Sequence, residues 1–167
     1  KKLFFIAHPF VFAKDTRTYI EGYNEIGDKI LCDKLPPFVR NQLVSTVKDV
    51  LLTIYWTIRY GPFDLFIGVD GVNACTGILL QHLGIVKRVI FYTIDYVPDR
   101  YVNTVLNRLY HAFDTRAVKG SYVVWNLSEI MVAMREKKGL NKAYREKQIV
   151  VPVGTEGGVK LVPFSQA

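Results

Sequence analysis

The chain has 167 residues, of which 50% are hydrophobic and 22% are charged, and its formal net charge is +7. This length allows one domain with a full hydrophobic core, and the composition excludes intrinsic disorder. The only cysteines, Cys32 and Cys75, lie far apart, which excludes a disulfide scaffold, and no apolar run reaches the ~18–20 residues of a membrane span.

Short apolar runs alternate along the chain with longer segments of helical periodicity. The runs predict six strands, at residues 3–7, 29–32, 65–69, 88–94, 122–125 and 148–151. Four of these runs are almost continuously apolar, as is typical of strands buried on both faces of a parallel sheet.

Helical patterns lie between these runs, at residues 38–60, 73–83, 102–119 and 128–139. The first is long enough for one helix or two, and Ser128 suits the N-cap of the last. The alternation predicts an α/β domain: a Rossmann-like, doubly wound, mostly parallel sheet of about six strands with helices on both faces.

The predicted domain covers residues 1–152. Residues 153–167 contain glycines and a proline without helical periodicity, so this segment is predicted to be an inter-domain linker or a frayed tail. We also leave open whether an opening strand and helix of the domain precede residue 1.

Polar residues follow most of the predicted strands. Ligands of open parallel sheets bind outside the carboxyl ends of the strands, so these residues are the candidate site. They are His8, Asp70, Gly71, Asn73, Asp95, Tyr96, Arg100, Asn126 and Ser128.

Asp95 is the strongest candidate because it directly follows a buried-strand pattern and precedes a proline-containing turn. Its carboxylate could accept hydrogen bonds from substrate hydroxyls, or act as a base if desolvation raised its pKa. The alternative is that Asp95 caps the turn or the following helix. The turn Asp70-Gly71 with Asn73 is a second candidate, for hydroxyl binding, or simply a common tight turn.

Each of the other candidates has both a binding role and a structural role open to it. Arg100 and Arg108 could each bind a phosphate or pair with a nearby carboxylate. His8 could bond a ligand hydroxyl or satisfy backbone groups, while His82 and His111 lie within helical patterns and are predicted to be structural. No His, Cys or Asp spacing indicates a metal site, and the glycine-rich dinucleotide and NTP signatures are absent from the sequence.

Residues 135–147 contain six Lys and Arg residues against two Glu residues. This segment predicts either a solvated helix face or a basic surface that contacts an anionic membrane peripherally. Nucleic-acid binding is not expected, because the aromatic residues lie mostly in apolar runs rather than on a basic face. The unpaired cysteines favour a cytoplasmic location, including the inner face of the membrane.

Four segments in order suggest a family: FDLFIGVD at 63–70, IFYTIDYVP at 90–98, VVWNLS at 123–128 and IVVPVG at 149–154. Together they resemble the N-terminal domain of a family 4 glycosyltransferase of the GT-B fold, over roughly residues 60–155. The resemblance implies two Rossmann-like domains facing each other across a cleft. The N-terminal domain then binds the acceptor, and the C-terminal domain binds most of the nucleotide-diphosphate sugar.

The resemblance also implies roles for particular residues. Asp95 stands where many members carry a histidine that positions or stabilises the reacting sugar, so it is the implied catalytic residue. Ser128 matches the serine that opens the helix after its strand, and Gly154 matches the glycine at the inter-domain hinge. The family's glycine-rich loop after its first strand, and its two glutamates eight residues apart, are absent from this sequence.

We therefore expect an acceptor-binding domain that takes part in transferring a hexose to a glycan or a lipid-linked acceptor. It has no covalently bound cofactor, and it is inactive without a C-terminal donor domain or a partner chain. The alternative is a non-catalytic Rossmann-like module that recruits a partner or a glycan. An oxidoreductase is disfavoured because the glycine fingerprint for a dinucleotide is missing.

Overall fold

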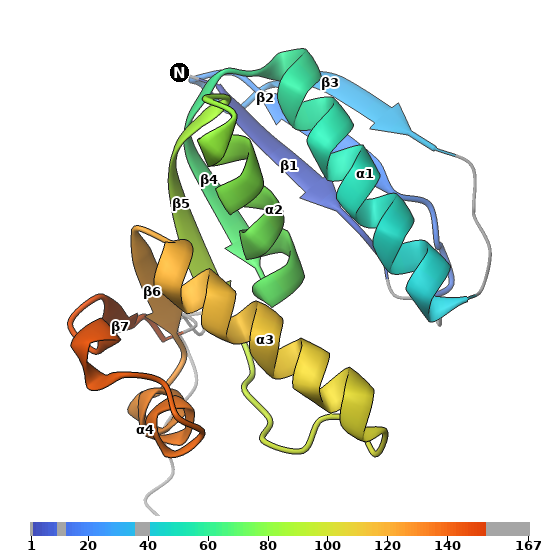
Figure 1. Cartoon of the computed structure of the whole chain (residues 1–167). Coiled ribbons are helices and arrows are strands. Elements are labelled where there is room, and N and C mark those ends of the chain that lie inside the picture. Colours follow the sequence, from blue (N-terminus) through green and yellow to red (C-terminus); the bar gives the residue numbers. More distant parts are fainter. Residues whose placement is uncertain (1, 10–12, 36–40, 153–167) are drawn as a thin grey trace, which may run out of the picture.

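The computed structural model describes residues 2–9, 13–35 and 41–152, and within them the chain forms two sheets and a set of helices (Figure 1). The antiparallel sheet contains β1 (Leu3–Ala7), β2 (Tyr19–Tyr23) and β3 (Lys29–Lys34), in that order. The parallel sheet has the order β4 (Phe63–Val69), β5 (Val86–Thr93), β6 (Val123–Asn126) and β7 (Gln148–Val150). The α-helices are α1 (Gln42–Tyr60), α2 (Gly71–His82), α3 (Thr104–Gly120) and α4 (Glu129–Lys137).

The α/β class and the parallel sheet are confirmed, but the prediction of about six strands in one sheet is not. The described parallel sheet has four strands, and the predicted strands at 3–7 and 29–32 belong to the separate antiparallel sheet. The cause is β2, which we did not predict and which alternates between buried and half-buried residues. The side chain of Asn24 then accepts hydrogen bonds from the backbone N–H groups of Ile26 and Asp28, and this tight turn returns β3 alongside β2.

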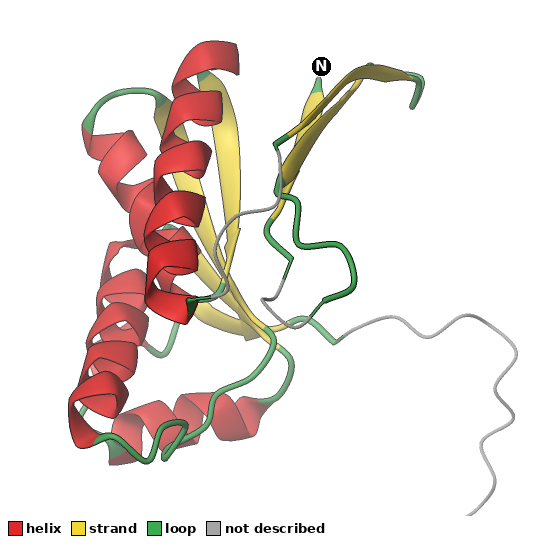
Figure 2. Ribbon diagram, turned by 90° about the vertical axis from the view of Figure 1, so that its right-hand side faces the viewer, coloured by secondary structure: helices red, strands yellow, loops and turns green. Residues whose placement is uncertain are grey.

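The helices that follow β4, β5 and β6 lie on one side of the parallel sheet (Figure 2). Each strand pairs with the next strand along the chain, and right-handed crossovers that always advance in one direction place their helices on the same face. Helices on both faces were expected, so this part of the prediction is corrected for the described residues. On the opposite face, Leu65, Ile67 and Val69 of β4 are exposed.

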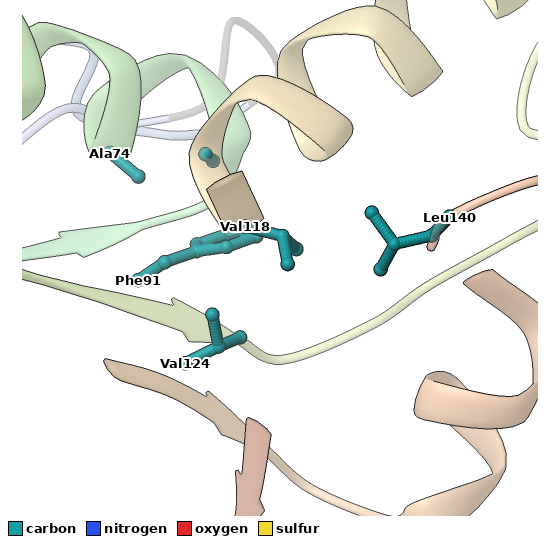
Figure 3. Packing of buried hydrophobic residues seen from close by; sticks show 6 residues of the cluster. Ala74, Phe91, Val118, Val124 and Leu140 are labelled. Atoms are coloured by element: carbon teal, nitrogen blue, oxygen red, sulfur yellow. The ribbon is translucent and has the colours of Figure 1, made fainter. Parts of the chain in front are cut away.

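The hydrophobic core lies between the parallel sheet and these helices. One buried cluster joins Ala74 of α2, Phe91 of β5, Val118 of α3 and Val124 of β6, and Leu140 closes it (Figure 3). A second buried cluster lies between α2 and β5. Close approach of β4 and α2 requires Gly68, because a Cβ at that position would lie 2.5 Å from the backbone nitrogen of Ala74.

Helix α1 is a single helix and packs beside α2 and against the antiparallel sheet (Figure 1). It begins at Asn41, whose side chain accepts hydrogen bonds from the N–H groups of Leu43 and Val44, as an N-cap does. Among the described residues, no helix combines the length and the apolar character needed to span a bilayer.

Candidate functional site

The register of the parallel sheet brings the ends of β4, β5 and β6 to one edge, as the sequence predicted. Val69 pairs with Tyr92, and Thr93 pairs with Asn126. The N–H of Asp70 donates to the carbonyl of Tyr92 across the same edge, over 3.3 Å. The residues that follow these strands therefore lie next to one another at the carboxyl edge.

Asp70 caps helix α2 in a strained backbone conformation. One carboxylate oxygen accepts hydrogen bonds from the N–H groups of Val72 (2.8 Å) and Asn73 (2.9 Å), and the Asn73 amide donates to the other oxygen (3.0 Å). Its φ of 78° and ψ of 164° lie in a region that is populated almost only by glycine. Desolvation raises the pKa of Asp70 although these hydrogen bonds lower it. Strain of this kind concentrates at functional sites.

Gly71 lies where helix α2 contacts helix α3. A Cβ on Gly71 would come within 3.1 Å of the backbone nitrogen of Asp114 in α3. The missing side chain therefore lets the first turn of α2 approach α3, and this packing accounts for the residue at this position.

Asp95 and Arg100 form an ion pair in the loop between β5 and α3. Arg100 donates to the Asp95 carboxylate over 2.7 Å, and the Asp95 side chain is 61% exposed. The Arg100 guanidinium also lies over the ring of Tyr110. Asp95 is thus an oriented carboxylate that is open to solvent at the carboxyl edge.

Tyr96 turns inward, directly after Asp95. Its hydroxyl lies 3.2 Å from Nδ1 of His111 in α3, and burial raises its pKa to about 12. The other ring nitrogen of His111 lies 2.7 Å from the carbonyl of Pro98, so this histidine holds the loop in place. His111 therefore has the structural contacts that its place in a helical pattern predicted.

His8 lies at the end of β1 rather than on the parallel sheet, and it joins β1 to α1. Its Nε2 is 2.8 Å from the Thr53 hydroxyl, and its Nδ1 is 3.1 Å from the Asp49 carboxylate. Burial acts to raise the pKa of Asp49, but hydrogen bonds from His8 and Lys48 lower it overall.

Asn126 and Ser128 follow β6 but have different environments. Asn126 is fully buried, its Oδ1 accepts from Arg135 over 2.6 Å, and its Nδ2 has no hydrogen-bond partner among the described residues. Ser128 does precede α4 as its N-cap residue, but its side chain makes no capping hydrogen bond. Gly154, the predicted hinge, lies outside the described residues.

Arg135 is the centre of a buried network that the sequence did not reveal, because the basic segment 135–147 predicts a solvated or membrane-facing surface. Its side chain is 1% exposed and makes two 2.8 Å hydrogen bonds to the Asp114 carboxylate. It also donates to Thr93, Asn126 and Gln148, which come from three neighbouring strands. The guanidinium of Arg135 thus links β5, β6 and β7 to α3 through hydrogen bonds.

The rest of the basic segment 135–147 is also partly engaged within the fold. Arg145 pairs with Glu136 at 2.7 Å, and the ammonium of Lys147 donates to the backbone carbonyls of Lys119 and Ser121. Burial lowers the pKa of Lys147. The segment therefore does not present all of its cations on one surface.

A cavity of about 600 Å³ opens between α3 and the end of α4. Its lining is Tyr96, Arg108, His111, Ala112, Thr115, Arg116, Lys119, Arg135 and Lys138. The exposed cations Arg108, Arg116 and Lys119 recur at helical spacing along α3, and no carboxylate of the described chain lines the cavity. This lining favours an anionic ligand such as a phosphate group. The spacing of cations along residues 102–119 is the sequence signal for this lining, and the sequence analysis predicts binding only for Arg108 among them.

The described His, Cys, Asp and Glu side chains form no group of three or more that could hold a metal ion. Comparisons of the chain with protein-family models, with curated proteins and with solved structures found no match. The resemblance to a glycosyltransferase domain therefore remains a prediction from the motifs quoted above.

Proposed function

We propose that this chain is the acceptor-binding domain of a nucleotide-sugar-dependent glycosyltransferase, which transfers a hexose to a glycan or a lipid-linked acceptor. The donor-binding domain is supplied by another part of the same protein or by a partner chain, and this chain alone is inactive. The observation that carries the proposal is the segment Asp95-Tyr96: Asp95 lies exposed at the carboxyl edge, and Tyr96 lines the cationic cavity beside it.

At the carboxyl edge, Asp95 is the group that meets the reacting sugar. Its carboxylate accepts a hydroxyl hydrogen bond and stabilises the positive charge that develops on a sugar ring during transfer. Arg100 holds this carboxylate in place through the 2.7 Å ion pair. Asp70 follows the neighbouring strand β4 and Asn73 lies in the first turn of α2, where they offer further partners for acceptor hydroxyls. Closure of the donor domain over this edge would exclude water that could hydrolyse the donor.

The cationic cavity supports an acceptor that carries a phosphate. Arg108, Arg116 and Lys119 are exposed along its α3 wall, and Arg side chains bind phosphate oxygens in a bidentate manner. A lipid-linked acceptor with a phosphate in this cavity and its sugar at Asp95 fits both features. Such an acceptor would place the domain at a membrane surface, in peripheral contact.

The complete protein that contains this chain provides the test. Its intact mass is measured first, and nucleoside diphosphate release from a panel of nucleotide sugars is then followed. We expect turnover by the complete protein with at least one sugar donor, and none by the 167-residue chain alone. No turnover with any donor, in the presence of glycan and lipid-linked acceptors, would count against the proposal.

A non-catalytic binding module is the second candidate, and one observation favours it. Leu65, Ile67 and Val69 of β4 are exposed on the sheet face opposite the helices, and an uncovered apolar face of this kind marks an interaction surface. A module of this type would bind a partner through β4 and show no sugar transfer in any assembly. The turnover measurement separates the two candidates.

A further inference from the structure

Helix α1 carries apolar side chains on its exposed face as well as on its buried face. Its buried face contains Trp56 together with hydroxyl residues such as Thr53 and Thr57. On the other face, Val47 and Leu51 are 60% and 61% exposed. The large apolar residues exposed along this helix are Leu43, Val44, Val47, Leu51, Tyr55 and Ile58. A surface helix of a globular protein buries its apolar stripe, so this stripe requires an apolar environment outside the described fold.

Helix α3 also exposes large apolar side chains. Val105, Leu109 and Phe113 recur at four-residue spacing and are all exposed, so they form one apolar ridge. The exposed cations Arg108 and Arg116 lie beside this ridge on the same helix. Apolar and cationic side chains are therefore interleaved on the surface of α3.

The charged residues exposed on α1, α2 and α3 are all cationic. Helices α1, α2 and α3 contain only two acidic residues, Asp49 and Asp114. Both face inward, where Asp49 pairs with Lys48 and Asp114 pairs with Arg135. The exposed cations of the same helices are Arg59, Arg108, Arg116 and Lys119.

These helices share one side of the molecule. Figure 2 shows α1, α2 and α3 together on one side of the two sheets, so their outer surfaces form a common layer. We propose that this layer, with the apolar stripe of α1 and the apolar and cationic surface of α3, docks on an anionic lipid bilayer. We call it the docking face.

A bilayer fits this composition better than a second copy of the chain. Apolar tips enter the acyl boundary while Arg and Lys side chains reach the lipid phosphates, which is how interfacial helices bind. A twofold contact centred on α3 would bring its cations against those of the other copy, and like charges across an interface repel. The cationic cavity shares α3 with this face, so lipid phosphates lie beside it when the domain is docked.

Vesicle flotation tests the proposal without any sugar chemistry, so its failure is distinguishable from failure of the proposed function. The 167-residue chain is mixed with vesicles of phosphatidylcholine, with or without a minor share of phosphatidylglycerol. We expect binding to the anionic vesicles that is at least about tenfold stronger than to the neutral ones, because each Arg or Lys near the surface contributes.

Two double variants probe the face, and each has a matched control elsewhere. Arg108→Glu with Arg116→Glu should weaken binding at least about tenfold, whereas Lys137→Glu with Lys142→Glu, which makes the same net charge change, should have a much smaller effect. Val47→Glu with Leu51→Glu should abolish the apolar contribution. Its control is Ile26→Glu with Ile30→Glu, at exposed positions in the turn before β3 and in β3 itself. Circular dichroism confirms that each variant is folded.

Two results would overturn the proposal. The first is no flotation of the wild-type chain with anionic vesicles, or an equal loss in the control variants. The second is a dimer in light scattering that the Val47 and Leu51 variant dissociates, without any vesicle binding by the wild type. That outcome would make the face a contact between copies.

Discussion

The antiparallel and the parallel halves of this chain differ in how many hydrophobic side chains they bury. Both buried hydrophobic clusters lie in the parallel half, with only Ile54 of α1 packed against one of them. Among the described hydrophobic residues of β1, β2 and β3, only Ile20 is buried. The antiparallel sheet is joined to α1 by polar contacts, in which His8 bonds Thr53 and pairs with Asp49, and by the stacked rings of Phe4 and Tyr60.

This difference indicates where stability and function reside. Apolar burial dominates folding free energy, so the parallel half carries most of the stability and provides a rigid support for the carboxyl edge. The junction of the antiparallel half relies in part on charged groups, so we expect it to open before the parallel half. Substitutions of two charged residues, one in each half, test this difference through the free energy of unfolding.

The largest effect on stability is expected at Arg135. Arg135→Met leaves the Asp114 carboxylate buried without its partner, and breaking a buried pair in this way costs about 3–5 kcal/mol. Urea unfolding followed by circular dichroism measures the loss. Lys138→Met, at an exposed position three residues along, is the control and should change the free energy of unfolding by less than about 0.5 kcal/mol. Equal effects of the two changes would contradict the structural role of the network.

A smaller effect, with a pH dependence, is expected at Asp49. Asp49→Asn removes the carboxylate charge that faces His8 and Lys48, at a cost of about 1–3 kcal/mol near neutral pH. The pKa of Asp49 is lowered in the folded state, so its contribution is present above the unfolded pKa of 3.8 and is lost as the pH falls through the folded value. The difference between wild type and variant should therefore shrink in acid. A difference that is independent of pH would contradict this assignment.

The same contrast explains what the sequence could predict. In the parallel half, apolar runs and helical periodicity located every strand and α-helix, and the edge residues Asp70 and Asp95 followed from strand ends alone. In the antiparallel half, β2 alternates in burial and includes Glu21 and Gly22, so it lacks the continuous apolar run by which the other strands were found. Two local strands then paired with β2 rather than with the parallel sheet.

Only part of the candidate site could be predicted from the sequence. Strand ends can be located in a sequence, but the direction and burial of a side chain depend on tertiary packing. Arg135 lies in a run of surface cations in the sequence, yet its partners Thr93, Asp114 and Gln148 come from distant segments. The cavity likewise needs α3 and α4 side by side before its cations converge.

The most direct test of the central claim compares Asp95→Asn with Asp99→Asn in the complete protein. Both aspartates are exposed and lie in the same loop, and exposed ion pairs contribute little, so each change should alter the free energy of unfolding by less than about 1 kcal/mol. The account predicts that Asp95→Asn lowers sugar transfer about 10²-fold, because a charge that stabilises the transition state is lost, while Asp99→Asn leaves transfer nearly unchanged. Unchanged transfer in Asp95→Asn, or equal losses in both variants, would contradict it.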